Sequence, residues 1–498
     1  FADLVPGSYE VSAQGQDGWV QTQPADNGSY TVEMTSGLVA DAKDFGMYQL
    51  PSTLSGMVYN DANENGTFDN GEVALEGYEI VLSENNVEIT RDTTGADGLY
   101  SFGGIYGGTY TVAQTLELGW VITEPAGGIY TVTVEGGQDI DTLNFGNRET
   151  TPGEFLGTVD SLWSNPANWG YGGLPAVGDA VVIRSGLRVV LDALSGNNSI
   201  ASLSVAGTLR VITSETLTIL GDVTGDGEIT VDADAQPTLE VSGNWQVGSF
   251  VRGKSTVSII GDDESIISAD DFYKLNISGG STSVDGIVNI YRWLSLNNTL
   301  NATDVTTINI LDENTDALQG AGNITQGTIV RAIGASETGV YRFHGQNSTI
   351  AFNTGKSSVN PPSLSVKKTK GVAVPSNLHQ TFKGGTVNAD LNTVTLSGVT
   401  HFSRWVMGQT GHSTGGTVSP TYEITEENPG KSSSVFSATV SMEYDQDSLG
   451  GIPEQTGVLG FFKTANAITV LNVYDNDLSI ATAGDRSPKD WGLRINDG

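Results

Sequence analysis

The stretch Asp61-Ala-Asn-Glu-Asn-Gly-Thr-Phe-Asp-Asn-Gly-Glu72 decides how the first part of this chain folds. Oxygen-bearing side chains stand at positions 1, 3, 5 and 9 of the stretch, glycine at position 6 and glutamate at position 12. This spacing allows one tight turn to gather about six or seven oxygen atoms around a hard cation. The sequence therefore predicts a calcium site. Its expected ligands are Asp61, Asn63, Asn65, Thr67, Asp69 and Glu72.

The segments that flank this stretch have the pattern of strands. Residues 56–59 before it and 78–82 after it alternate or run apolar, and they include Val, Ile and Tyr. Such segments favour β-structure, so the helices of an EF-hand are not expected. The loop should join two strands of a β-domain. The alternative interpretation is a solvated acidic turn that binds no metal.

Composition and charge narrow the fold and function classes. The chain has 498 residues, 64 of them glycine, and no long segment with a 3.6-residue apolar period, which predicts several nearly all-β domains. Lys and Arg total 23 against 58 Asp and Glu, giving a net charge of −35 that argues against nucleic-acid partners. The absence of cysteine excludes disulfides and thiolate metal sites. No apolar run reaches the ~20 residues of a membrane span.

The first 50 residues repeat the end of the following hundred. Phe1, Tyr9 and Trp19 recur 101 positions later as Phe102, Tyr110 and Trp120, and Phe45-Gly46 recurs 100 positions later as Phe145-Gly146. A period of about 100 residues indicates tandem domains of immunoglobulin size. Residues 51–150 are expected to form one complete β-sandwich, and residues 1–50 the C-terminal half of another. The two tryptophans are interpreted as packing residues.

Residues 51–147 resemble one B-type repeat of the Sdr surface-protein family. The matching residues are the 61–72 stretch, Thr94-Gly-Ala-Asp-Gly-Leu-Tyr-Ser-Phe102, Gly108-Thr-Tyr-Thr-Val112 and Asn144-Phe-Gly-Asn147. The resemblance implies a calcium-binding β-sandwich that serves as a stiff stalk outside the cell. Related modules often carry a Lys–Asn isopeptide crosslink, but residues 51–150 contain no lysine. Calcium is then the remaining candidate for a staple, and Asp97 either adds a ligand or shapes its turn.

Residues 151–415 are expected to form a parallel β-helix or similar solenoid. Short strands with period-two alternation, such as 200–209 and 217–221, follow one another with Gly or Asn turns between them. Trp163-Ser-Asn-Pro-Ala-Asn-Trp169 and Asn244-Trp245 resemble the Asn-Trp corners that open β-helix-like rungs in large secreted bacterial surface proteins. Such coils also carry polysaccharide lyases, so a carbohydrate-active enzyme is the alternative function.

No catalytic residue is predicted. The nearest candidates are Asp262-Asp-Glu264 and Asp270-Asp271 near Arg252 and Lys254, but neighbouring residues of a strand point to opposite faces, so solvated turns are expected. The histidines stand singly, which gives a zinc site no support. Asp222–Asp226 resembles half of a second calcium loop whose position 12 falls on Ala233, and a Gly-rich turn is the alternative there.

Residues 416–498 are expected to form a further, incomplete β-sandwich-like segment, with strands near 437–443, 458–462 and 467–471. The expected function is that of an extracellular, calcium-stabilised subunit or segment of a bacterial surface filament, stalk or adhesin that self-associates through β-domains which lack strands. A further alternative is an adhesin that binds a carbohydrate or a host protein. An exposed row of tryptophans would favour ligand binding, and their burial would favour the structural role; the row is Trp163, Trp169, Trp245 and Trp293.

Overall fold

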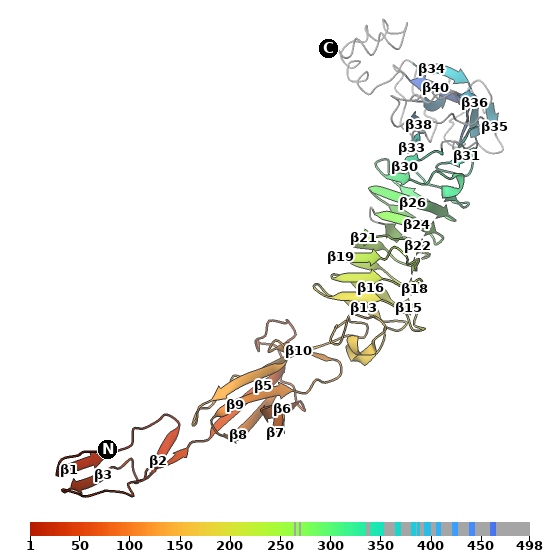
Figure 1. The fold of residues 1–498 in the computed structure, drawn as a ribbon. Helices are drawn as coiled ribbons and strands as arrows, with labels where there is room; N and C mark the ends of the chain where they lie inside the picture. Colours follow the sequence, from red (N-terminus) through yellow and green to blue (C-terminus); the bar gives the residue numbers. More distant parts are fainter. Residues whose placement is uncertain are drawn as a thin grey trace, which may run out of the picture. The chain divides into compact units, whose positions relative to one another are not determined.

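Strands make up almost all regular structure of the protein. The computed structural model describes residues 1–262, 265–267, 270–334 and 339–352, and eight further strands between residues 364 and 464. In this part of the chain the helices are three single 3-10 turns, η1 (Pro166–Asn168), η2 (Gly170–Gly172) and η3 (Thr315–Ala317), and none can span a membrane. The all-β prediction is confirmed. The chain divides into two compact units, residues 1–151 with 170–172 and the remainder (Figure 1).

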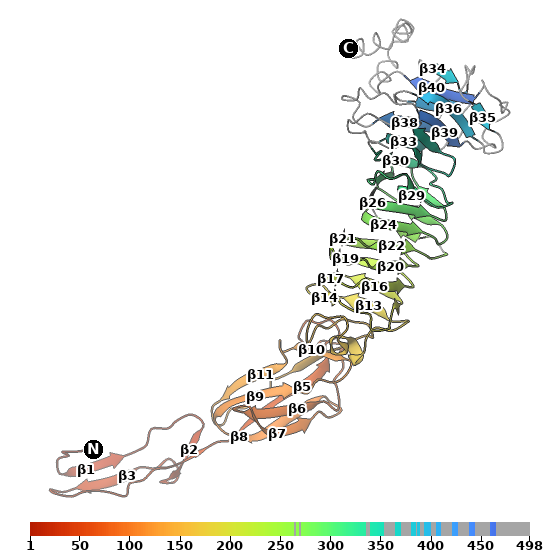
Figure 2. The same ribbon diagram turned by 45° about the vertical axis from the view of Figure 1, so that its right-hand side comes forward.

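The complete module of the first unit is a sandwich of two four-stranded sheets (Figure 2). One sheet has the order β10 (Trp120–Glu124), β12 (Phe145–Glu149), β5 (Ser52–Asn60), β8 (Leu99–Ile105). The other has the order β11 (Ile129–Val134), β9 (Gly108–Gln114), β6 (Glu79–Glu84), β7 (Val87–Thr93). All neighbours are antiparallel except β12 and β5. Alternating residues such as Leu54, Ile80 and Val112 fill the space between the sheets.

The first 50 residues repeat half of this sandwich. Strands β1 (Gly7–Val11) and β3 (Tyr30–Met34) pair as β9 and β11 do, with Tyr9 opposite Val32 as Tyr110 is opposite Val132. Strands β2 (Trp19–Gln23) and β4 (Gly46–Gln49) pair as β10 and β12 do. Residues 1–50 contain no counterparts of β5 to β8. Phe1 is therefore fully exposed, whereas its counterpart Phe102 is only 4% exposed.

The second unit begins as a parallel β-solenoid, as predicted. One sheet contains β13 (Ala180–Ile183), β16 (Ser202–Val205), β19 (Val223–Val231), β21 (Trp245–Val251), β23 (Ser265–Ile267), β25 (Thr282–Val284) and β27 (Leu300–Ala302), with β14 (Arg188–Leu191) and β17 (Thr208–Val211) beside them. The other contains β15 (Ser199–Ile200), β18 (Thr216–Ile219), β20 (Thr238–Val241), β22 (Thr256–Ile259), β24 (Asp271–Ile277), β26 (Ile287–Leu296), β28 (Thr307–Ile310) and β30 (Gly327–Arg331), with β29 (Leu318–Gln319) on β26.

In the solenoid, the register between neighbouring strands places similar residues above one another. Leu217, Leu239, Val257, Leu275 and Leu294 occupy matching positions of successive rungs and are all buried. Each rung therefore extends one apolar core, which is why period-two alternation in short segments is enough to specify the coil. Successive rungs also come very close at one corner. A Cβ atom on Gly261 would lie 1.8 Å from the carbonyl oxygen of Ser242, so only glycine fits there.

Three tryptophans lie inside the solenoid rather than on its surface. The rings of Trp163 and Trp169 meet edge to face at 4.7 Å, and Trp169 Nε1 donates to the carbonyl oxygen of Trp163 at 2.8 Å. Trp245 packs in the same way against Phe250. All three are almost fully buried, whereas Trp293 is half-buried. The four tryptophans thus do not form an exposed row.

Parallel pairing ends at β30, well before residue 415. Strand β30 pairs antiparallel with β33 (Leu364–Thr369), which continues to β38 (Thr421–Glu426), β37 (Trp405–Gln409), β40 (Leu459–Thr464) and β34 (Gln380–Gly384). A second sheet has the order β31 (Gly339–Arg342), β32 (Thr349–Phe352), β39 (Ala438–Glu443), β36 (Thr393–Val399), β35 (Thr386–Asn388). Strands on both sides of residue 415 share these sheets. The strand expected at 467–471 lies outside the described residues.

Candidate metal site

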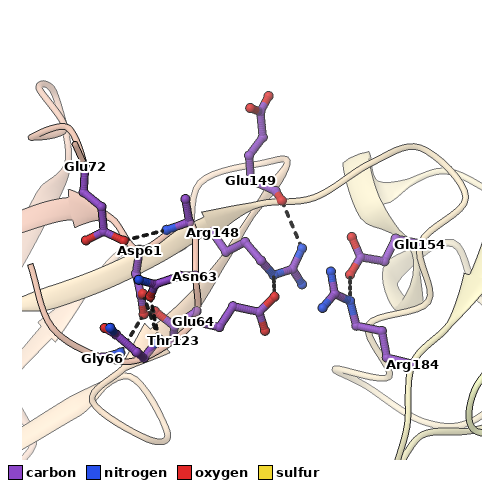
Figure 3. A network of polar contacts seen from close by, with 12 residues as sticks. Asp61, Asn63, Glu64, Gly66, Glu72, Thr123, Arg148, Glu149, Glu154 and Arg184 are labelled. Carbon is purple, nitrogen blue, oxygen red and sulfur yellow. Dashed lines mark hydrogen bonds and ion pairs between the residues drawn. The ribbon is translucent and has the colours of Figure 1, made fainter. Parts of the chain in front are cut away.

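The 61–72 loop follows β5, and Figure 3 labels Asp61, Asn63 and Glu72 of its predicted ligands. Hydrogen bonds within the loop involve all six. Asp61 is fully buried and anchors the loop. Its Oδ1 accepts a hydrogen bond from the backbone N–H of Asn65, and its Oδ2 accepts one from that of Gly66, both at 3.0 Å. Gly66 has a positive φ of 75°, which glycine adopts without strain, and this explains the residue at position 6.

A neighbouring strand fixes the same carboxylate. Thr123 on β10 donates from its hydroxyl to Asp61 Oδ2 at 2.6 Å. Asp61 also sits beside Tyr59, whose pKa rises to about 12 because burial disfavours the phenolate and because Asp61, Glu72 and Glu124 add negative charge. The site is therefore a region of concentrated negative potential, with its first ligand held on two sides.

The two amides of the loop point toward Asp69. Asn63 and Asn65 donate from Nδ2 to Asp69 Oδ2 at 3.0 and 2.7 Å, and these bonds hold the pKa of the Asp69 carboxyl below its usual range. Asn65 Oδ1 in turn accepts from the backbone N–H and the hydroxyl of Thr67, both at 2.8 Å. The side-chain N–H groups of Asn63 and Asn65 thus lie next to the Asp69 carboxylate. A cation bound there would need the amide oxygens at these positions instead.

Glu72 closes the loop with both carboxylate oxygens. Oε1 accepts from the backbone N–H of Ala62 at 3.1 Å, and Oε2 accepts from that of Asp69 at 3.0 Å. A glutamate at position 12 of a calcium loop binds through both oxygens, and this side chain is already turned inward.

The six predicted ligands are of the chemical type that binds a hard cation. All six side chains carry oxygen, and rotation of the two amides by half a turn would present their oxygens where their N–H groups now lie. In the described part of the chain no three His, Cys, Asp or Glu side chains stand together as a metal cluster. Binding at this loop would therefore depend on the amides as well as on the carboxylates.

The loop is also tied to the last strand of its domain. Glu64, at position 4, pairs with Arg148 of β12, with 3.0 Å between Glu64 Oε1 and Arg148 Nε. Arg148 Nη1 donates to the carbonyl oxygen of Glu149, and the Glu149 carboxylate accepts from the Tyr171 hydroxyl at 3.0 Å. Figure 3 also draws a separate ion pair of the second unit. In this pair Arg184 Nε lies 2.6 Å from Oε1 of the buried Glu154.

Other sequence candidates do not converge on this site. Asp97 Oδ1 accepts from the backbone N–H of Leu99 at 3.1 Å, which is a turn-shaping role. Asp222 accepts from the side chain and backbone of Asn244, and the residues that follow it enter β19 instead of forming a loop.

The acidic pair of the solenoid is split between two faces, as the strand argument predicts. Asp270 accepts from the indole N–H of Trp245, whereas Asp271 accepts from Asn289. Asp263 and Glu264 lie outside the described residues, as do three of the histidines. The fourth, His344, is buried with its Nε2 3.0 Å from the carbonyl oxygen of Gly327.

Sequence reasoning missed Thr123, Glu64 and Arg148. Thr123 lies 62 residues from its partner Asp61, and no local pattern marks that contact. Its counterpart in the first repeat is also threonine, Thr22, where the loop is absent. The internal repeat therefore does not mark Thr123 as a residue that contacts the loop.

Comparisons with known proteins identify the complete module. Residues 52–145 match the family model of the SdrD B-like domain, which confirms the predicted B-type repeat. Serine-aspartate repeat-containing protein D of Staphylococcus aureus (strain Newman) is 30% identical over 138 residues, 26% of this chain and 10% of that protein. Serine-aspartate repeat-containing protein F of Staphylococcus epidermidis is 27% identical over 183 residues, 33% of this chain and 10% of that protein. The matches thus span about a tenth of these relatives.

Solved structures resemble the chain only weakly. The Bacillus anthracis TIE protein is 20% identical, with 29% of this chain and 25% of that chain covered and a TM-score of 0.21. The major pilin subunit BcpA of Bacillus cereus is 16% identical, with 21% of this chain and 34% of that chain covered and a TM-score of 0.15. Likeness at this level carries no argument about fold or function.

Proposed function

We propose that this chain is a calcium-stabilised structural segment of a bacterial surface protein, such as a stalk, filament or adhesin. The observation that carries the proposal is the 61–72 loop of the SdrD B-like domain, which brings six oxygen-bearing side chains into one hydrogen-bonded turn. The domain has no cysteine and no lysine, so neither a disulfide nor an isopeptide bond can staple it.

In this proposal the loop residues hold the calcium ion. Asp61, Asn63, Asn65, Asp69 and Glu72 supply side-chain oxygens, and Thr67 supplies an oxygen at position 7. The ion would balance the negative charge near Tyr59 and replace the amide N–H groups beside Asp69. Through Thr123 and the Glu64–Arg148 pair, a fixed loop would stiffen the link between β5, β10 and β12.

The proposal places the chain outside the cell, where calcium is abundant enough to fill a loop of this kind. It also includes self-association of the chain. It assigns no catalytic residue; Asp270 accepts from Trp245 and Asp271 accepts from Asn289, so the two carboxylates have different partners.

Thermal unfolding of the chain with calcium or with a chelator tests the metal site. Calcium at about 100 times its Kd should raise the Tm of the SdrD B-like domain by roughly 10–20 °C, since ligand binding then contributes about 2.7 kcal/mol. The double variant Asp61→Ala, Glu72→Ala should lose this shift.

A matched variant controls for the change in charge. Glu117→Ala with Glu135→Ala removes two exposed carboxylates from the same domain and should keep the calcium shift. If the loop variant melts at a lower temperature by the same amount in calcium and in chelator, the loop serves packing and the metal proposal fails.

A further inference from the structure

Strands β24 and β26 contain a break in the alternation of buried and half-exposed residues. In β18, β20 and β28, by contrast, every second residue is buried. Here Phe272 is opposite Ile290 and Lys274 is opposite Trp293, so two residues of β26 face the single Tyr273. A bulge of this kind changes where side chains point and recurs near functional sites.

The bulge leaves three aromatic rings and two cations half-exposed on one sheet. Together with Arg252 from the turn before β22, these residues are called the aromatic strip: Tyr273, Lys274, Tyr291, Arg292 and Trp293. Neighbouring strands lie about 4.8 Å apart, so the residues of the strip on β24 and β26 are neighbours on one sheet.

Two of the three cations in the strip rest on rings. The guanidinium carbon of Arg252 lies 3.4 Å from the centroid of the Tyr291 ring. Lys274 Nζ lies 5.7 Å from the Tyr273 ring and 6.0 Å from the Trp293 ring. Among the described residues neither cation forms an ion pair, although the chain has 58 acidic residues for 23 basic ones. Both charges are thus available to an anionic ligand.

Polar contacts hold two side chains of the strip, Tyr291 and Arg292, in place. Asp271 accepts from the Tyr291 hydroxyl at 3.1 Å and from Asn289 at 2.7 Å, and Asn309 donates to Asn289 at 2.7 Å. Arg292 is fixed by Asp312 at 2.8 Å. Side chains fixed before binding lose little conformational entropy when a ligand arrives.

We propose that the aromatic strip binds an acidic glycan. Aromatic faces suit the apolar faces of pyranose rings, and Lys274 and Arg252 would pair with the carboxylates of uronic-acid residues. The amides beside them offer hydrogen bonds to hydroxyl groups. Asp271 and Asp312 bring two negative charges to the strip, against the three positive charges of Arg252, Lys274 and Arg292. At physiological salt the Debye length is about 8 Å, so acidic groups farther away are largely screened. This binding is independent of the calcium loop.

Calorimetric titration of the full chain with a short oligogalacturonate tests the site. We expect saturable binding that weakens as salt rises. Trp293→Ala and Lys274→Met should each lower the affinity roughly tenfold, because each removes one ring or one charge from contact with the ligand. Trp293→Phe, which keeps a ring, should retain most of the affinity, and Thr238→Ala on the same sheet should change nothing.

Three results would overturn the inference. The first is no saturable binding by the folded chain. The second is equal affinity for a neutral oligosaccharide such as maltohexaose, which would remove the role of the cations. The third is binding of oligogalacturonate that Trp293→Ala leaves unchanged while circular dichroism shows intact β-structure, which would indicate simple charge attraction.

Discussion

Asp270 is a carboxyl group whose protonation should affect the stability of the solenoid. Burial raises its pKa to about 6, and the negative charge of Asp271 acts in the same direction, while the hydrogen bond from Trp245 opposes them. An unfolded aspartate has a pKa of about 3.9, so the folded state favours the protonated form. The stabilisation is complete below pH ~4 and is lost as the pH rises through about 6.

We therefore predict that Asp270→Asn flattens this pH dependence. Asparagine cannot ionise and can still accept from the Trp245 indole. Denaturant unfolding at several values between pH 4 and pH 7 should show the wild-type free energy of unfolding falling relative to that of the variant. Asp285→Asn, an exposed aspartate on the following rung, should track the wild type. Parallel curves for wild type and Asp270→Asn would contradict the prediction.

At the level of residues, the sequence predicts what is local. The predicted ligands of the 61–72 loop lie within twelve residues of chain, so their spacing alone keeps them near one another. Tyr273 and Tyr291 carried no such signal, because their exposure depends on a bulge between two strands whose register the sequence does not display. Trp163 and Trp169 do not belong to an exposed row, because their rings pack against each other in the core. The sequence does not display this orientation either.

Strands β1 to β4 form two two-stranded sheets whose inner face no other described strand covers. Val11 on β1 is half-buried and lines an open hollow of about 680 Å³, whereas its counterpart Val112 is fully buried against the second sheet. In the complete module β9, the counterpart of β1, pairs with β6 on the edge that β1 leaves open. Open edges and uncovered apolar faces accept strands from other chains.

For the 498-residue chain studied by itself, we predict concentration-dependent self-association in the presence of calcium. Sedimentation velocity at rising concentration should show oligomers of the wild type, and Val11→Glu should reduce them because it places a charge on the uncovered face. Gln14→Glu adds the same charge at an exposed position of the same half-module and should associate as the wild type does. A wild-type chain that stays monomeric at high concentration would refute this part of the proposal.

Individual strands were easier to predict than the way they assemble. Period-two alternation identifies the rungs because each rung repeats the same local rule. The end of parallel pairing at β30 could not be read in this way. It depends on β33 pairing antiparallel with β30, and on β39 joining β32 and β36 across long intervals of sequence.

The two compact units depend on different sources of stability. The second unit has one continuous apolar core that runs from Phe155 to Met442. The first has a much smaller core, and its SdrD B-like domain adds a loop of charged and amide side chains. Calcium should therefore act on the first unit and leave the solenoid unchanged.

Direct calcium binding by the 61–72 loop is the measurement that tests this account most directly. Isothermal titration of the chelator-treated chain with calcium should show a binding event that is missing from Asp61→Ala, Glu72→Ala and retained by Glu117→Ala, Glu135→Ala. Identical titrations for all three proteins, or no binding by the wild type, would contradict the account.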